Sequence, residues 1–177
     1  MAAQDIATAL QRVESVLRRR PEAGLHDDAP ALAQWTGGLR VRATHDDGTA
    51  LVTDMPPEIG GSGEGVTPGW LLRAALASCA VTRIAMAAAS AGIVLQTLEA
   101  RAQSRSDLRG LFGLSAPDGT PVSAGPGDLR LLVRIGAAGV AAERLRSLVH
   151  QSCHCAPVSR AMEEALPVAL QVEVDEA

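Results

Sequence analysis

Hydrophobic residues recur with two different periods along the chain, and these periods predict where helices and strands lie. Residues 4–19 carry aliphatic side chains three or four positions apart, which is the spacing of an amphipathic helix. Residues 38–54 alternate apolar and polar side chains on both sides of the turn signal Asp46-Asp47-Gly48, which predicts a β-hairpin. The first third of the chain therefore combines a helix with antiparallel strands.

The next segment predicts one long apolar helix. Thr67 suits the N-cap position because its side chain can accept a backbone hydrogen bond. Pro68 suits the first helical position, where the N–H group that it lacks has no partner in any case. Gly92 is typical of a helix C-terminus. We therefore expect a helix over residues 68–91, entered through a loop rich in glycine and proline.

The same helix lies within the longest apolar stretch of the chain, residues 70–95. Arg73 and Arg83 interrupt this stretch, and each arginine costs about 3 kcal/mol at the centre of a bilayer. We interpret it as a buried helix of a soluble protein with no membrane partner. Residues 1–20 lack the apolar core and cleavage site of a signal peptide. We expect a cytoplasmic protein whose thiols stay reduced.

The remaining pattern completes the predicted fold class. Helices and strands do not alternate as βαβ units, so we predict an α+β fold rather than a doubly wound parallel sheet. Residues 1–34 are expected to form an N-terminal helical arm and linker, and residues 35–177 the folded domain. The other predicted elements are a strand over 93–105, a strand over 129–137, a helix over 141–152, a helix from Pro157 and a closing strand over 166–175.

Composition and charge narrow the range of partners. The chain has no Tyr, one Phe and two Trp, so aliphatic residues must fill its core. Its formal net charge of -4 comes from acidic and basic residues that are scattered along the sequence. Without a basic stripe or aromatic residues on which bases could stack, we expect no nucleic-acid partner.

Cys79 lies in the middle of the predicted apolar helix, and two interpretations are open. A free cysteine is among the most buried residue types, so it can simply pack in the core. Alternatively, Arg83 lies one helical turn further along the same face, where a guanidinium favours a thiolate. Arg83 can equally reach a carboxylate or solvent.

A second group of candidates is Cys153, His154 and Cys155. One interpretation is a zinc site, but structural zinc sites usually show two separate pairs of ligands. Another is a redox thiol, because Cys155 lies two residues before Pro157, where the N–H groups of a helix start favour a thiolate. A third is an inert cysteine. The glycine-rich loop lacks the Lys-Ser/Thr of a phosphate loop, and we expect neither a metal nor a cofactor.

Two motifs together resemble the OsmC/Ohr family of osmotically inducible and organic hydroperoxide resistance proteins. The first is GGSGEGVTPGWLLRAALASC, a glycine-rich loop followed by an Ala/Leu-rich helix that carries Cys79. The second is CAPVSRAM, in which Cys155 precedes a Pro-Val-Ser helix start. The resemblance covers residues 35–177. It implies antiparallel sheets around long central helices, and an intertwined homodimer with its sites at the interface.

The resemblance also implies a function. Cys79 would be the peroxidatic cysteine and Cys155 the resolving cysteine of a thiol-dependent peroxidase that reduces organic hydroperoxides. A dithiol reductant, in this family often of lipoyl type, would restore both thiols. Members of the family usually have a Glu about ten residues before the first cysteine, where this chain has Gly69. Glu64 with Arg40, Arg42 or Arg83 is a candidate substitute.

The departures from the family pattern leave alternatives open. Ala156 separates Cys155 from Pro157, so Cys153 is a rival resolving thiol. A non-catalytic OsmC-like protein that binds an apolar small molecule is the main alternative function. A redox or metal sensor built on Cys153, His154 and Cys155 is a third.

Overall fold

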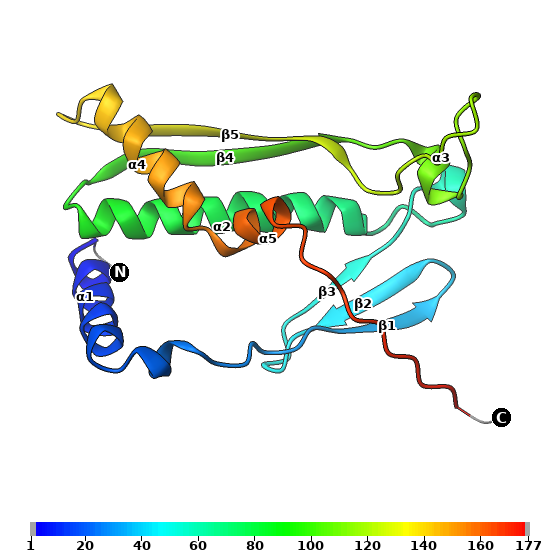
Figure 1. Ribbon diagram of the computed structural model, residues 1–177, viewed down its shortest axis with the longest axis horizontal. Helices are drawn as coiled ribbons and strands as arrows, with labels where there is room; N and C mark the ends of the chain where they lie inside the picture. The colour runs from blue at the N-terminus through cyan, green and yellow to red at the C-terminus, as the bar shows by residue number, and fades with distance from the viewer. Residues whose placement is uncertain (1–2, 176–177) are drawn as a thin grey trace.

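The computed structural model describes residues 3–175 and confirms the predicted α+β class with antiparallel strands. Most predicted elements are present close to their predicted bounds, and one additional strand precedes the hairpin (Figure 1). In chain order, the helices are α1 (Ala3–Arg19), α2 (Pro68–Ser90), α3 (Leu108–Leu111), α4 (Ala142–His154) and α5 (Pro157–Glu163), and the strands are β1 (Leu32–Gly37), β2 (Arg40–Thr44), β3 (Ala50–Thr53), β4 (Leu95–Arg105) and β5 (Gly127–Ala137).

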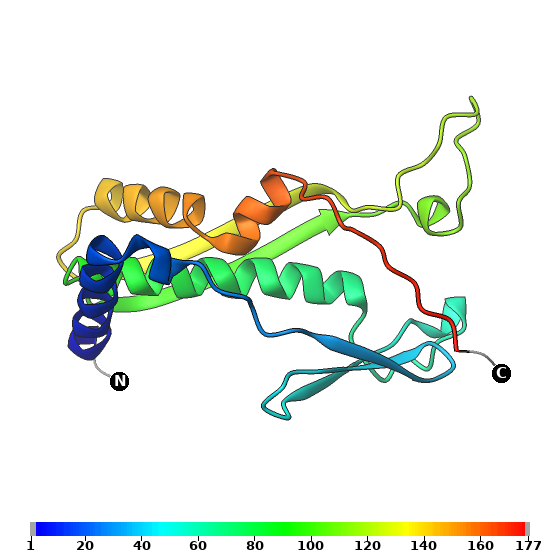
Figure 2. The same cartoon turned by 60° about the horizontal axis from the view of Figure 1, so that its bottom comes forward.

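Helix α2 is the centre of the molecule. It packs against β4 on one side and against α4 and α5 on another, and α1 contacts it near its C-terminal end (Figures 1 and 2). A stripe with a four-residue repeat, Leu76, Ala80, Ile84 and Ala88, is buried. Alanines at these positions let the backbones of neighbouring elements approach closely, which offsets the shortage of aromatic side chains.

By length and composition α2 could also cross a membrane, and it is the single helix within residues 3–175 that could. This is weak evidence for a membrane span, because the core helix of a soluble protein meets the same criterion.

The residues that begin α2 are those expected. The Thr67 side chain accepts a hydrogen bond from the Trp70 backbone N–H at 3.2 Å, and Pro68 is the first helical residue.

The strands form two separate antiparallel sheets on opposite sides of α2. Strands β4 and β5 form a two-stranded ribbon, and β1, β2 and β3 form a three-stranded sheet in that order. The predicted hairpin corresponds to β2 and β3, and β1 was not expected. The division into an arm of residues 1–34 and a domain of residues 35–177 stays a prediction, although β1 begins at Leu32.

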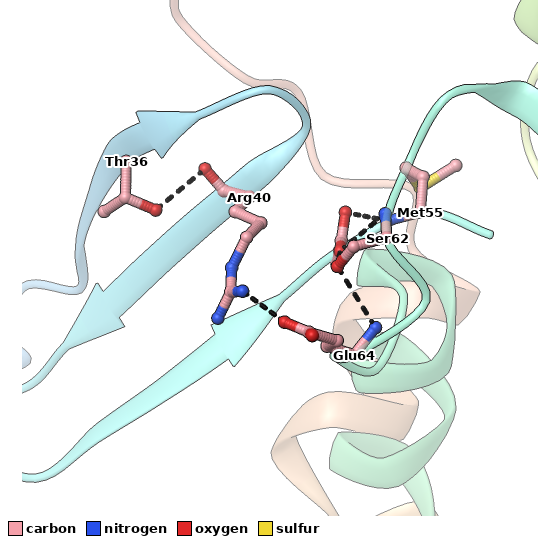
Figure 3. Close-up of polar contacts among 6 residues, drawn as sticks. Thr36, Arg40, Met55, Ser62 and Glu64 are labelled. Atoms are coloured by element: carbon pink, nitrogen blue, oxygen red, sulfur yellow. Dashed lines mark hydrogen bonds and ion pairs between the residues drawn. The ribbon is translucent and has the colours of Figure 1, made fainter. Parts of the chain in front are cut away.

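The glycine-rich loop that leads into α2 is held by a buried carboxylate. Asp54, 1% exposed, accepts hydrogen bonds from the backbone N–H groups of Met55 at 2.7 Å and Ser62 at 3.0 Å, and another from the Ser62 hydroxyl (Figure 3). These bonds, that from the Ser62 side chain above all, hold the pKa of Asp54 below its usual value. Further along the loop, Glu64 forms an ion pair with Arg40 of β2 at 2.5 Å (Figure 3).

The predicted closing strand over residues 166–175 is wrong for the single chain. Residues 166–175 contain no strand, and the segment leaves α5 and passes the three-stranded sheet as an extended tail (Figure 1). Its alternating apolar side chains are exposed, with Val168 at 91%. An alternating pattern specifies one apolar face, but a strand forms only where a neighbouring edge supplies its backbone hydrogen bonds.

The loop geometry predicts a stability effect at Gly61. A Cβ atom at this position would lie 1.7 Å from the backbone oxygen of Met55, so Gly61→Ala must displace the loop. We expect a loss of about 1–3 kcal/mol in the free energy of unfolding, measured with urea. Gly69→Ala is the matched control, because the nearest atom lies 3.8 Å from its Cβ. It should be neutral or stabilise by up to about 1 kcal/mol; equal losses in both variants would contradict this account.

Candidate functional site

Cys79 lies half-buried near the middle of α2, and Arg83 follows it by one helical turn. Both side chains line an open hollow of about 620 Å³ on the side of α2 that faces α5. Residues four apart share a helix face, so the sequence correctly predicts their common direction. The packing interpretation of Cys79 is therefore incomplete, because this thiol borders a space that a small molecule can enter.

Cys155 lines the same hollow from the turn between α4 and α5. Its backbone N–H donates to the Ser152 carbonyl oxygen at 3.1 Å and so closes the last turn of α4. Ala156, which is fully buried, is the N-cap residue of α5, and Pro157 is the first residue of that helix. The structure thus brings together the two cysteines singled out by sequence, from segments about 75 positions apart. Cys155 is exposed, so reagents in solution can reach its sulfur.

The walls of this hollow, here called the thiol hollow, are mainly apolar. Short aliphatic and thioether side chains surround the two sulfurs, and two hydroxyl groups are the other polar groups besides Arg83. Such walls accept an alkyl or aryl group. The remaining lining residues are Ala75, Ser78, Thr82, Met86, Pro157 and Val158.

Arg83 is the cation of the thiol hollow. The ion pairs found within residues 3–175 use other arginines, so no carboxylate there neutralises its guanidinium. The candidate acid Glu64 pairs instead with Arg40, and neither of them lines the hollow. Arg42 of β2 does not line it either. Of the candidate arginines, the single chain places Arg83 alone beside Cys79.

Gly69 occupies the position where the family usually has a Glu, but this position is not beside Cys79 in the single chain. Ten residues of α-helix span about 15 Å, so an acid at position 69 could not touch the sulfur of its own helix. The nearest side-chain atom to a Cβ at this position belongs to Arg73, at 3.8 Å. The absence of a Glu at Gly69 therefore leaves the local surroundings of Cys79 within one chain unchanged.

Cys153 does not line the thiol hollow, although it lies near enough to Cys79 for their charges to interact. It lines a second hollow of about 620 Å³, bounded by the inner face of β5 together with α2, α4 and α5. Burial raises the pKa of the Cys153 thiol, and negative charge at Cys79 and Glu163 raises it further. Burial still disfavours ionisation of Cys153 after Cys79 has become a neutral sulfenic acid, which makes Cys153 the weaker candidate for the resolving thiol.

The second hollow was not predicted. Its walls come from four elements that are distant in sequence, and no local pattern identifies such a space. The Ser159 hydroxyl borders it and is buried without a hydrogen-bond partner among residues 3–175. Within that part of the chain, no three or more His, Cys, Asp and Glu residues lie close enough together to hold a metal ion.

Comparisons with known proteins identify the family and the fold. The sequence model of the OsmC-like protein family matches residues 61–171. Comparison with curated proteins gives no match. Among solved structures, an OsmC-like protein from Mycoplasma pneumoniae is 14% identical, with a TM-score of 0.64 over 78% of this chain and 89% of its own.

Two further solved structures are described as organic hydroperoxide resistance proteins. That from Legionella pneumophila is 21% identical, with a TM-score of 0.54 over 77% of this chain and 91% of its own. That from Elizabethkingia anophelis is 19% identical, with a TM-score of 0.55 over 78% and 89%. At these identities the structures show the fold alone, whereas the family match spans well over half of the sequence. The chain belongs to the OsmC-like protein family.

Proposed function

We propose that this protein is a thiol-dependent peroxidase that reduces organic hydroperoxides through Cys79 and Cys155. The observation that carries the proposal is that both thiols line one apolar hollow together with the guanidinium of Arg83, which forms no ion pair among residues 3–175. A cation beside a cysteine stabilises the thiolate, which is the reactive form. Two structurally similar proteins, both described as organic hydroperoxide resistance proteins, support the same substrate class.

The first step is oxidation of Cys79. Its thiolate attacks the terminal oxygen of the hydroperoxide, the O–O bond breaks, and the sulfur becomes a sulfenic acid. The leaving alkoxide takes a proton and departs as the alcohol. Arg83 holds the thiolate before attack and stabilises the negative charge that moves onto the leaving oxygen. The apolar walls hold the organic group and disfavour hydrogen peroxide, which has none.

The second step forms a disulfide and the third restores the enzyme. The Cys155 thiol attacks the sulfenic sulfur of Cys79, and one water molecule leaves as the disulfide forms. A dithiol reductant, for example a lipoyl group, then attacks this disulfide by thiol exchange. The reductant ends as a cyclic disulfide, and both cysteines return as thiols. The exposure of Cys155 favours attack at its sulfur.

The protein is proposed to work in the cytoplasm as a homodimer. The exposed tail supports association, because five apolar side chains alternate along it: Leu166, Val168, Leu170, Val172 and Val174. In a water-soluble protein such an apolar face is stabilised when the segment pairs with a neighbouring strand, which a second copy can provide. The family resemblance implies that the sites lie at the dimer interface, so Arg40 and Glu64 are proposed to act across it.

Turnover of cumene hydroperoxide with a dithiol reductant tests the proposal. We expect activity in the wild type and loss of at least about a thousandfold in Cys79→Ser, because the nucleophile is removed. Cys155→Ser should consume one equivalent of peroxide and then stop. Cys153→Ser is the matched control and should keep its activity. A wild type without turnover would contradict the proposal, as would equal activity in Cys79→Ser.

A second prediction concerns Arg83. Replacing it by Gln removes the positive charge that lines the thiol hollow with Cys79. A charged hydrogen bond to the leaving oxygen is worth roughly 1.5–3 kcal/mol, so its loss should lower the rate of Cys79 oxidation by about 10- to 150-fold. Stopped-flow measurement of the oxidation rate checks this. Arg144→Gln, at an exposed position of α4 away from the hollow, is the control. If Arg40→Gln slows oxidation and Arg83→Gln does not, the cation is wrongly assigned.

One observation favours a second function, the binding of an apolar small molecule without turnover. The second hollow has aliphatic walls from β5 and α2, and the Ser159 hydroxyl, which has no hydrogen-bond partner among residues 3–175, is available to donate to a ligand there. Native mass spectrometry of protein purified from cells would detect such a ligand. A copurified apolar molecule together with a wild type that lacks peroxide turnover would favour this function over the peroxidase.

A further inference from the structure

A third hollow lies at the end of the β4–β5 ribbon that is nearest the start of α2. It has a volume of about 780 Å³ and shares no residue with the thiol hollow. Three arginines from different elements line it: Arg73 of α2, Arg105 of β4 and Arg130 of β5. The peroxidase proposal does not account for this group, and of the three arginines Arg73 alone lies within a motif quoted for the family.

The pairing of the two strands is irregular at this hollow. Gln103 pairs with Arg130 and Arg105 pairs with Gly127, so the single residue Ser104 lies opposite two residues of β5. This is a β-bulge, a feature that redirects side chains and often occurs next to functional sites. Arg105 and Arg130 reach the same hollow at the position of the bulge.

Asp128 lies within the bulge and has a backbone φ of 49°, in the left-handed region. Glycine is usual at such a position, and another residue costs of order 1 kcal/mol there. Strain of this kind is retained where the surrounding structure imposes it, and it is concentrated at binding sites. Asp128 is also the one carboxylate that lines the hollow, and it forms no ion pair with the three arginines.

Arg73 reaches this hollow from the buried side of the ribbon. It precedes Leu76 and Ala80 by three and seven residues and so shares the face of α2 that packs against other elements. Its guanidinium donates to the Ser104 hydroxyl at 3.2 Å, and its other N–H groups have no partner among residues 3–175. A half-buried arginine on an otherwise apolar stripe requires hydrogen-bond acceptors for its guanidinium N–H groups. One serine hydroxyl satisfies only some of these groups.

We propose that this hollow is a binding site for a phosphate group. Three guanidinium groups and one carboxylate leave an excess positive charge in a protein whose formal net charge is -4. None of the three arginines takes part in the ion pairs of residues 3–175. Arginines bind phosphate through paired N–H groups, and the Ser106 hydroxyl lines the same space. A tetrahedral dianion has enough acceptor oxygens for all of these donors.

Calorimetric titration of the full-length protein with inorganic phosphate tests the proposal, with sodium chloride keeping the ionic strength constant. We expect saturable binding that Arg73→Gln and Arg130→Gln each weaken at least about tenfold. Arg101→Gln is the matched control, since Arg101 is exposed on β4 but does not line the hollow. Asp128→Asn should strengthen binding, because it removes a competing negative charge.

Phosphate binding no stronger than that of chloride would overturn the proposal. So would equal weakening in Arg101→Gln and Arg130→Gln, because it would show only a general charge effect. Glycerol 3-phosphate and vesicles containing phosphatidate distinguish the two sources of the group, a soluble ester or a lipid headgroup, and binding of either supports the site. The titration contains no peroxide, so its outcome is independent of the peroxidase proposal.

Discussion

The structure depends on close packing around α2, a helix built mainly from alanine and leucine. Ala80 and Ile84 are completely buried, and Ala88 lies beside Ile93 and Leu145 in the core cluster. Small side chains let β4, α4 and α5 approach the helix, since the chain has few large aromatic residues to fill space. Cys79 lies on this helix, so the packing that stabilises the fold also fixes the position of the thiol.

The thiol hollow is a consequence of the same packing. Helix α4 ends at His154, and the short turn through Cys155 and Ala156 brings α5 against α2. The complete burial of Ala156 anchors this turn, which leaves Cys155 exposed and lining the hollow. The extra residue between the second cysteine and Pro157 is therefore accommodated by the turn, and Cys155 remains in the same hollow as Cys79.

Much of the fold could be predicted because its signals are local. Thr67, Pro68 and Gly92 mark the ends of α2, and a helix start is visible at Pro157. The closing strand was predicted wrongly for the single chain, since alternation specifies a face and not the edge that must pair with it. The second and third hollows could not be predicted, because their walls combine residues from elements that are distant in sequence.

The central claim is that Cys79 and Cys155 form one redox pair, and disulfide mapping tests it most directly. The protein would receive one equivalent of cumene hydroperoxide, followed by alkylation, proteolysis and mass spectrometry. The account predicts a disulfide between Cys79 and Cys155, with Cys153 alkylated as a free thiol. A disulfide between Cys79 and Cys153, or no disulfide with all three cysteines still alkylated, would contradict it.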